Sequence, residues 1–64
     1  MEYTYGDNAF KILAVINKRL KRSGLDYETV TRLIESYNKE AQDGDYDHLY
    51  DVSEKYRREF LNES

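Results

Sequence analysis

The stretch LDYETVTRLIESYNKEAQ, residues 25–42, decides the fold, because it combines a helix start signal, a helical period and a stop signal. Asp26 is typical of an N-cap, since a short carboxylate accepts hydrogen bonds from the free amides of a first helical turn. Leu25 and Val30 flank this cap at the spacing of a hydrophobic staple. Gly44 follows the last apolar residue of the period and suits a helix exit.

The apolar residues of this stretch recur every three or four positions and fall on one face of a helix over residues 27–42. They are Tyr27, Val30, Leu33, Ile34, Tyr37 and Ala41. The opposite face is polar and holds two i,i+4 pairs with the acid first, which is the favourable order. A helix with one apolar face has to bury it against other elements. The segments on either side are therefore expected to cover it.

The N-terminal flank predicts a helix over residues 9–23. Asp7 or Asn8 can cap its start, and Gly24 follows its strongly basic last turn. Cations in a last turn also complement the helix dipole. Residues 1–6 precede this helix and contain two tyrosines, so we expect a short Tyr-rich arm that lies across the helices.

The C-terminal flank predicts a third helix over residues 47–62, capped by Asp45 or Asp47. Short connections favour neighbouring helices packed antiparallel. The expected fold class is all-α, a compact three-helix bundle that forms a single small domain over residues 1–64. The expected core consists of Ile12, Leu13, Ile16, Leu20, Leu25, Val30, Leu33, Ile34, Tyr37, Leu49, Val52, Tyr56 and Phe60.

Length and composition limit what such a chain can be. Sixty-four residues without cysteine lie near the lower margin for building a sufficient core, so self-association is a natural expectation. A hydrophobic content of 39% is too high for a disordered chain. No apolar run approaches the roughly 20 residues of a membrane span, and the first residues lack the order of a signal peptide. We therefore expect a cytoplasmic protein that does not bind membranes.

Seven tyrosines are many for a chain of this length. Tyrosine is amphipathic and enriched at protein interfaces, although tyrosines also cover the edges of small cores. Four of them have no evident place in the core, and two apolar residues of the first helix lie off its main face. The candidate partner-binding residues are Tyr3, Tyr5, Tyr46, Tyr50, Phe10 and Val15.

The end of the first helix carries a basic cluster. Residues 7–24 hold five bases and one acid, whereas residues 25–64 hold five bases and eleven acids. Such a cluster could contact phosphates, but the net charge of −3 opposes non-specific binding to nucleic acid. A nucleic-acid-associated regulator is therefore an alternative, and opposite charges could equally pair one chain with another. The nucleic-acid-binding candidates are Lys18, Arg19, Lys21 and Arg22.

An acidic run after the second helix has the spacing of calcium ligands. Five carboxylates stand at relative positions 1, 3, 5, 9 and 12, a pattern that resembles an EF-hand loop. His48 stands at position 6, where that loop needs glycine, and a helical apolar stripe runs through the same residues. A degenerate calcium site is therefore a further alternative. Its ligands would be Asp43, Asp45, Asp47, Asp51 and Glu54.

No arrangement of residues predicts an enzyme. The chain has no cysteine, a single histidine at position 48, and serines without the context of a catalytic triad. A domain of this size has little room for a buried pocket. We expect a non-enzymatic protein-interaction or regulatory module without a cofactor, which binds a protein partner or itself. A small accessory protein of a bacterium or phage would fit this size and composition.

Overall fold

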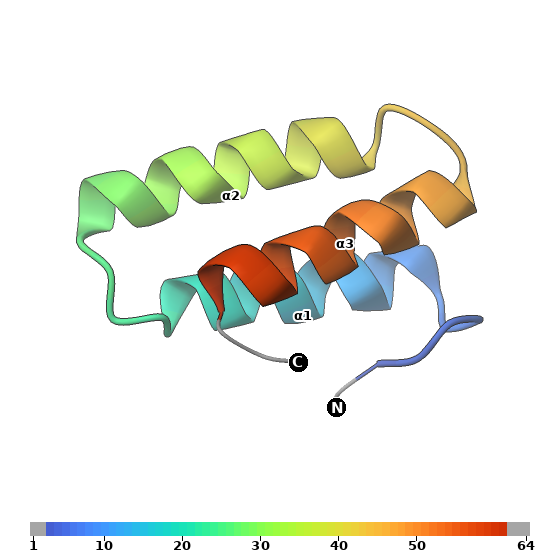
Figure 1. The fold of residues 1–64 in the computed structure, drawn as a ribbon, viewed down its shortest axis with the longest axis horizontal. Coiled ribbons are helices and arrows are strands. Elements are labelled where there is room, and N and C mark those ends of the chain that lie inside the picture. Colours follow the sequence, from blue (N-terminus) through green and yellow to red (C-terminus); the bar gives the residue numbers. More distant parts are fainter. Residues whose placement is uncertain (1–2, 62–64) are drawn as a thin grey trace.

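The computed structural model describes residues 3–61 and contains three helices, each of which packs against the other two. They are α1 (Ala9–Lys21), α2 (Tyr27–Ala41) and α3 (Tyr46–Phe60). Figure 1 shows that α1 and α3 run in the same direction and that α2 runs opposite to both. The predicted all-α three-helix bundle is confirmed.

Each helix begins at a side-chain cap. Asn8, Asp26 and Asp45 accept hydrogen bonds from the backbone N–H of Phe10, Thr29 and His48, respectively. These bonds satisfy amides that have no partner within their own helix. The cap predicted for α2 is confirmed, and the two pairs of alternatives are resolved in favour of Asn8 and Asp45.

All three helices end one or two residues earlier than the sequence predicts, α2 at Ala41 instead of residue 42. The first stops at Lys21 rather than at residue 23, because the chain turns into Gly24, whose φ of +86° is costly for residues with a side chain. The third begins at Tyr46 and ends at Phe60. The predicted end of that helix at residue 62 lies outside the described residues.

The core runs along the seam of the three helices. α1 supplies one aliphatic side chain per turn, α2 supplies Tyr37, and α3 supplies Tyr56, whose ring centroid lies 5.2 Å from that of Tyr37. The Tyr37 hydroxyl lies 2.6 Å from the hydroxyl of Ser53, which itself donates to the carbonyl of Leu49. The hydroxyls of Tyr37 and Ser53 in this core are thus paired. The core residues are Tyr3, Ile12, Ile16, Leu20, Tyr37, Ala41, Leu49, Val52 and Tyr56.

Two residues of the expected core, Leu25 and Phe60, lie on the surface instead, as does Tyr27 of the predicted apolar face of the second helix. Tyr27 is 86% exposed, Leu25 is 44% exposed and Phe60 is 39% exposed. All three lie at the end of the bundle where α1 and α3 end and α2 begins (Figure 1). The helical period identifies the correct face, but there is no neighbouring helix at this end to cover it.

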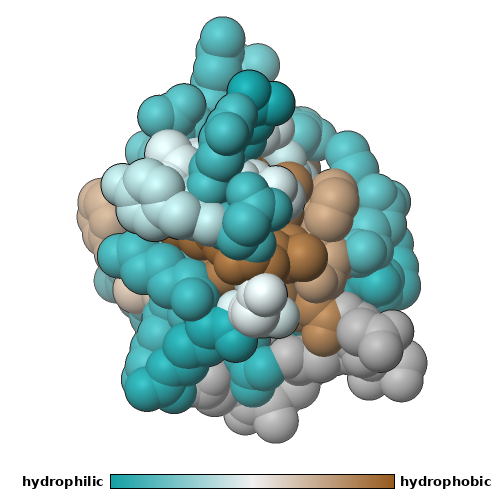
Figure 2. Space-filling view, turned by 90° about the vertical axis from the view of Figure 1, so that its left-hand side faces the viewer, coloured by the Kyte–Doolittle hydropathy of each residue, from teal (hydrophilic) through white to brown (hydrophobic). Residues whose placement is uncertain are grey.

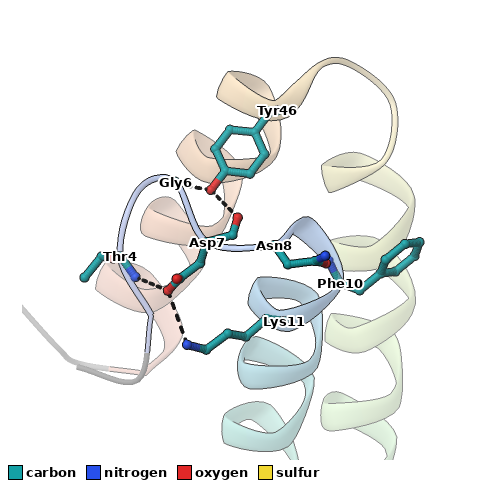
Figure 3. A network of polar contacts seen from close by, with 7 residues as sticks. All are labelled: Thr4, Gly6, Asp7, Asn8, Phe10, Lys11 and Tyr46. Carbon is teal, nitrogen blue, oxygen red and sulfur yellow. Dashed lines mark hydrogen bonds and ion pairs between the residues drawn. The ribbon is translucent and has the colours of Figure 1, made fainter.

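The arm before α1 folds back onto α3, as Figure 3 shows for its middle part. The hydroxyl of Tyr46 accepts from the N–H of Gly6 at 2.8 Å and donates to the carbonyl of Asp7 at 2.6 Å. The Asp7 carboxylate accepts from the N–H of Thr4 and pairs with Lys11 at 3.4 Å. These bonds join the arm to both α1 and α3.

Among the described residues, no helix is both long and apolar enough to cross a membrane.

Candidate functional site

An open groove lies where α1 ends and α2 begins, and we call it the α2 groove. Its volume is about 630 Å³, within the range of small-ligand and side-chain binding sites, and it opens to solvent rather than forming a buried pocket. It lies between the last residue of α1 and the first half of α2. Its walls are formed by Lys21, Leu25, Tyr27, Val30, Thr31, Ile34 and Glu35.

Local sequence explains why this groove is apolar. Leu25 precedes the Asp26 cap and Val30 follows it by one turn, so both side chains face the same side of the helix start. Tyr27 and Ile34 lie on one face of α2, because they are seven residues apart. Figure 2 shows hydrophobic surface in the middle of this end of the molecule, with hydrophilic side chains around it.

Tyr27 is the most exposed large apolar residue of the described chain, at 86%. Its exposure follows from its position as the first residue of α2, where no neighbouring helix lies over it. A tyrosine ring held on a rigid helix loses little entropy when it binds, which is why such residues are frequent in interface centres. The helical period places Tyr27 on the apolar face that has to be buried, so Tyr27 was not among the candidate binding residues predicted from the sequence.

Charged residues of both signs border the groove. Lys21 lies on the α1 side and Glu35 on the α2 side. The exposed Lys18 and Arg22 share the edge of α1 with Lys21, since the three residues fall within one helical arc of about 100°. Arg19, in contrast, is half-buried. Of the four members of the basic cluster predicted from the sequence, Lys21 lines the groove.

Most of the predicted partner-binding tyrosines hold the arm in place. Tyr3 is 2% exposed and donates to Glu54 at 2.7 Å, so it offers no surface to a partner. Tyr46 and Tyr50 are half-buried, and the ring of Tyr5 lies edge-on against both. Tyr5 also donates its hydroxyl proton to Asp47. These four residues form one cluster, but its main contacts are within the molecule.

The two apolar candidates of α1 differ from each other. Val15 is half-buried and packs against the core. Phe10 is 77% exposed, and in Figure 3 its ring projects from the start of α1 toward the α2 side, away from the arm. Phe10 lines a second, smaller hollow of about 290 Å³ among the starts of α1 and α3 and the end of α2. Phe10 thus remains a candidate binding residue.

The acidic candidates do not converge on a cation site. Three of these carboxylates already accept hydrogen bonds within the molecule. Asp45 caps α3, Asp47 accepts from the hydroxyl of Tyr5, and Glu54 accepts from Tyr3 and Arg57. The apolar stripe of α3 passes through the same segment and is buried. Within residues 3–61, no group of three or more His, Asp or Glu side chains is placed to hold a metal ion. No three of the expected ligands Asp43, Asp45, Asp47, Asp51 and Glu54 are therefore gathered at one point.

Two tyrosines have strongly perturbed acidities that report on packing rather than chemistry. Burial raises the pKa of Tyr37 to about 12. Burial, together with the hydrogen bond to Glu54, raises the pKa of Tyr3 even further. Both hydroxyls are therefore neutral and serve as structural hydrogen-bonding groups at physiological pH.

Comparison of the chain with models of known protein families, with curated proteins and with solved structures finds no match.

Proposed function

We propose that this protein is a non-enzymatic protein-binding module and that the α2 groove is its binding site. The observation that supports the proposal is the 86% exposure of Tyr27 beside an apolar groove. Soluble domains that expose a large aromatic residue next to an apolar hollow commonly use it as an anchor for a partner.

The chemistry of the groove favours a protein ligand. Its floor consists of aliphatic side chains, and its rim carries one base and one acid, Lys21 and Glu35. An apolar side chain of a partner can enter the floor, while charged groups around it pair with the rim and fix the orientation. This combination is that of a small interface centre with a polar border.

Affinity capture from cells that produce the protein tests the proposal. We expect Tyr27→Ser to lower the recovery of a specific partner at least tenfold, because an anchor residue is removed. Arg32→Ser is the matched control, since Arg32 is an exposed residue on the opposite side of the same helix. Equal recovery by both variants and by the unchanged protein would contradict the proposal.

Binding of nucleic acid is the second candidate, and the exposure of Lys18, Lys21 and Arg22 on one edge of α1 favours it. The net charge of −3 opposes it. If phosphate contacts were made there, a labelled duplex would bind at low salt, and its affinity would fall steeply with added salt. Absence of binding at low salt would remove this candidate.

A further inference from the structure

The seam between α1 and α2 on the side away from α3 carries matching features at its two ends. Asn17 and Asn38 join the helices at the middle through hydrogen bonds of 2.8 and 3.2 Å. On α1, Phe10 and Lys21 share a face with Asn17, because they lie seven and four residues from it. The exposed ring of Phe10 thus lies at one end of this seam, and the α2 groove lies at the other.

Resting on the proposed function, we propose that the occupant of the α2 groove is a second copy of this chain. The two copies pack their α1–α2 seams face to face and antiparallel, related by a two-fold axis at the Asn17–Asn38 pair. Phe10 of each copy then enters the groove of the other. Such an isologous arrangement closes as a dimer.

The spacing along the helices agrees with this register. Phe10 lies seven residues from Asn17, or about 10.5 Å along α1 at 1.5 Å per residue. Thr31, in the middle of the groove, lies seven residues from Asn38 toward the opposite end, which is again about 10.5 Å. A two-fold axis at the asparagine pair therefore brings Phe10 of one copy level with the groove of the other.

Charge supports the antiparallel direction. The end of α1 beside the groove carries the exposed bases Lys21 and Arg22, whereas the opposite end of the bundle carries Asp43 and Asp45 in the turn and Asp47 in the first turn of α3. Antiparallel packing places the basic end of one copy near the acidic end of the other. Parallel packing would place like charges together, which is unfavourable.

The size of the face indicates the strength of the association. A face two helices wide and about 20 Å long covers roughly 400 Å² per copy, given helix diameters of about 10 Å. The total of roughly 800 Å² for both copies is smaller than a standard interface and is the size of a weak, transient complex. We therefore expect a dimer that forms in the micromolar range, with polar asparagines at its centre to fix the register.

The test combines sedimentation equilibrium over a concentration series with NMR on a mixture of labelled and unlabelled protein. We expect a monomer–dimer equilibrium and intermolecular contacts between the Phe10 ring and the methyl groups of Val30 and Ile34. Phe10→Ser is expected to weaken the dimer at least tenfold. Because Phe10 is 77% exposed, the variant should keep its helix content and thermal midpoint, which circular dichroism verifies.

A mixing experiment tests the reciprocity of the contact. A mixed dimer forms when the Phe10→Ser and Tyr27→Ser variants are combined in equal amounts. In it, the native Phe10 of one variant meets the native Tyr27 groove of the other, so one of the two contacts is intact. The mixed dimer should therefore be tighter than either variant alone. Association that is no tighter in the mixture would overturn the proposal.

Three further results would overturn it: a strict monomer throughout the series, particles larger than a dimer, or a dimer without contacts between Phe10 and the groove. If the protein is a strict monomer but Tyr27→Ser still lowers the capture of a different protein, only the proposal that a second copy fills the groove fails. The proposed function would survive that result. If both the dimer and the effect of Tyr27→Ser on capture are absent, the proposed function fails as well.

Discussion

The hydroxyl of Tyr3 donates a 2.7 Å hydrogen bond to the carboxylate of Glu54, a residue 51 positions further along the chain. Glu54 also accepts from Arg57 at 2.7 Å, and all three side chains are largely removed from water. Through this contact the N-terminal arm becomes part of the core, where Tyr3 is packed edge-on against Tyr50. The bundle is thus closed by a residue outside its three helices.

Tyr3→Phe is expected to destabilise the fold by about 1–2 kcal/mol, because Glu54 loses a partner in a largely buried setting. Tyr5→Phe is the matched control. It also removes a tyrosine hydroxyl from the arm, but Tyr5 is 60% exposed, so its cost should stay within about 0.5 kcal/mol. Urea denaturation of the two variants measures both values. Equal costs would show that the arm does not contribute through Tyr3.

Alkaline pH should unfold the protein through its buried tyrosines. Burial raises the pKa of Tyr37 from 10.0 to about 12, so an unfolded chain loses this proton before the folded chain does. The stabilising contribution is complete below about pH 10 and is lost as pH rises toward about 12, with a size of about 1–3 kcal/mol.

The variant Tyr37→Phe isolates this effect. It should be less sensitive to pH in that window and nearly as stable as the unchanged protein at neutral pH, because Ser53 keeps its bond to the carbonyl of Leu49. Denaturation midpoints measured across the window test the expectation. Parallel pH profiles for the two proteins would contradict it.

Acid pH should weaken the start of α2. Hydrogen bonds from the side chain and backbone of Thr29 hold the pKa of Asp26 below its usual value of 3.8. A lowered pKa stabilises the fold above the unfolded value, and this contribution is lost as pH falls through the folded value. Asp26→Asn should keep the cap, because asparagine is a good N-cap, yet lose this pH dependence. Chemical denaturation between about pH 5 and about pH 2 makes the comparison.

Position 44 requires glycine because the His48 side chain lies close to it, not because of its backbone angle. A Cβ at this position would lie 2.8 Å from the ring and 2.9 Å from the Cβ of His48, whose Nε2 lies 2.9 Å from the carbonyl oxygen of Glu40. Gly44→Ala should therefore cost about 1–3 kcal/mol, as overpacking does. In a His48→Gly background, which removes the His48 Cβ as well as the ring, the same substitution should cost clearly less. An unchanged cost there would show that the conflict lies elsewhere.

The helices and most of the core could be predicted because they depend on local signals. Asp26 caps α2 as expected, and the three- and four-residue spacing correctly selects Ile12, Ile16 and Leu20 of α1 for burial. These features need only residues within a few turns of one another.

The exposed and the long-range parts of the molecule could not be predicted in this way. The period places Tyr27 on the inner face of α2, but exposure depends on how far the neighbouring helices extend, and α1 has already ended at Lys21. Tyr3 and Tyr46 act through partners 39 to 51 residues away. The α2 groove was therefore not predicted, and neither were the contacts that Tyr3 and Tyr46 make within the molecule.

Photo-crosslinking from position 27 tests the central claim, that the α2 groove is a protein-binding site, most directly. The photoreactive benzoylphenylalanine replaces Tyr27 in one sample and Arg32 in the control, and mass spectrometry identifies the products formed in the producing cells. The account predicts a specific protein adduct from position 27, either a second copy or another protein, and none from position 32. Identical product patterns from the two positions would contradict it.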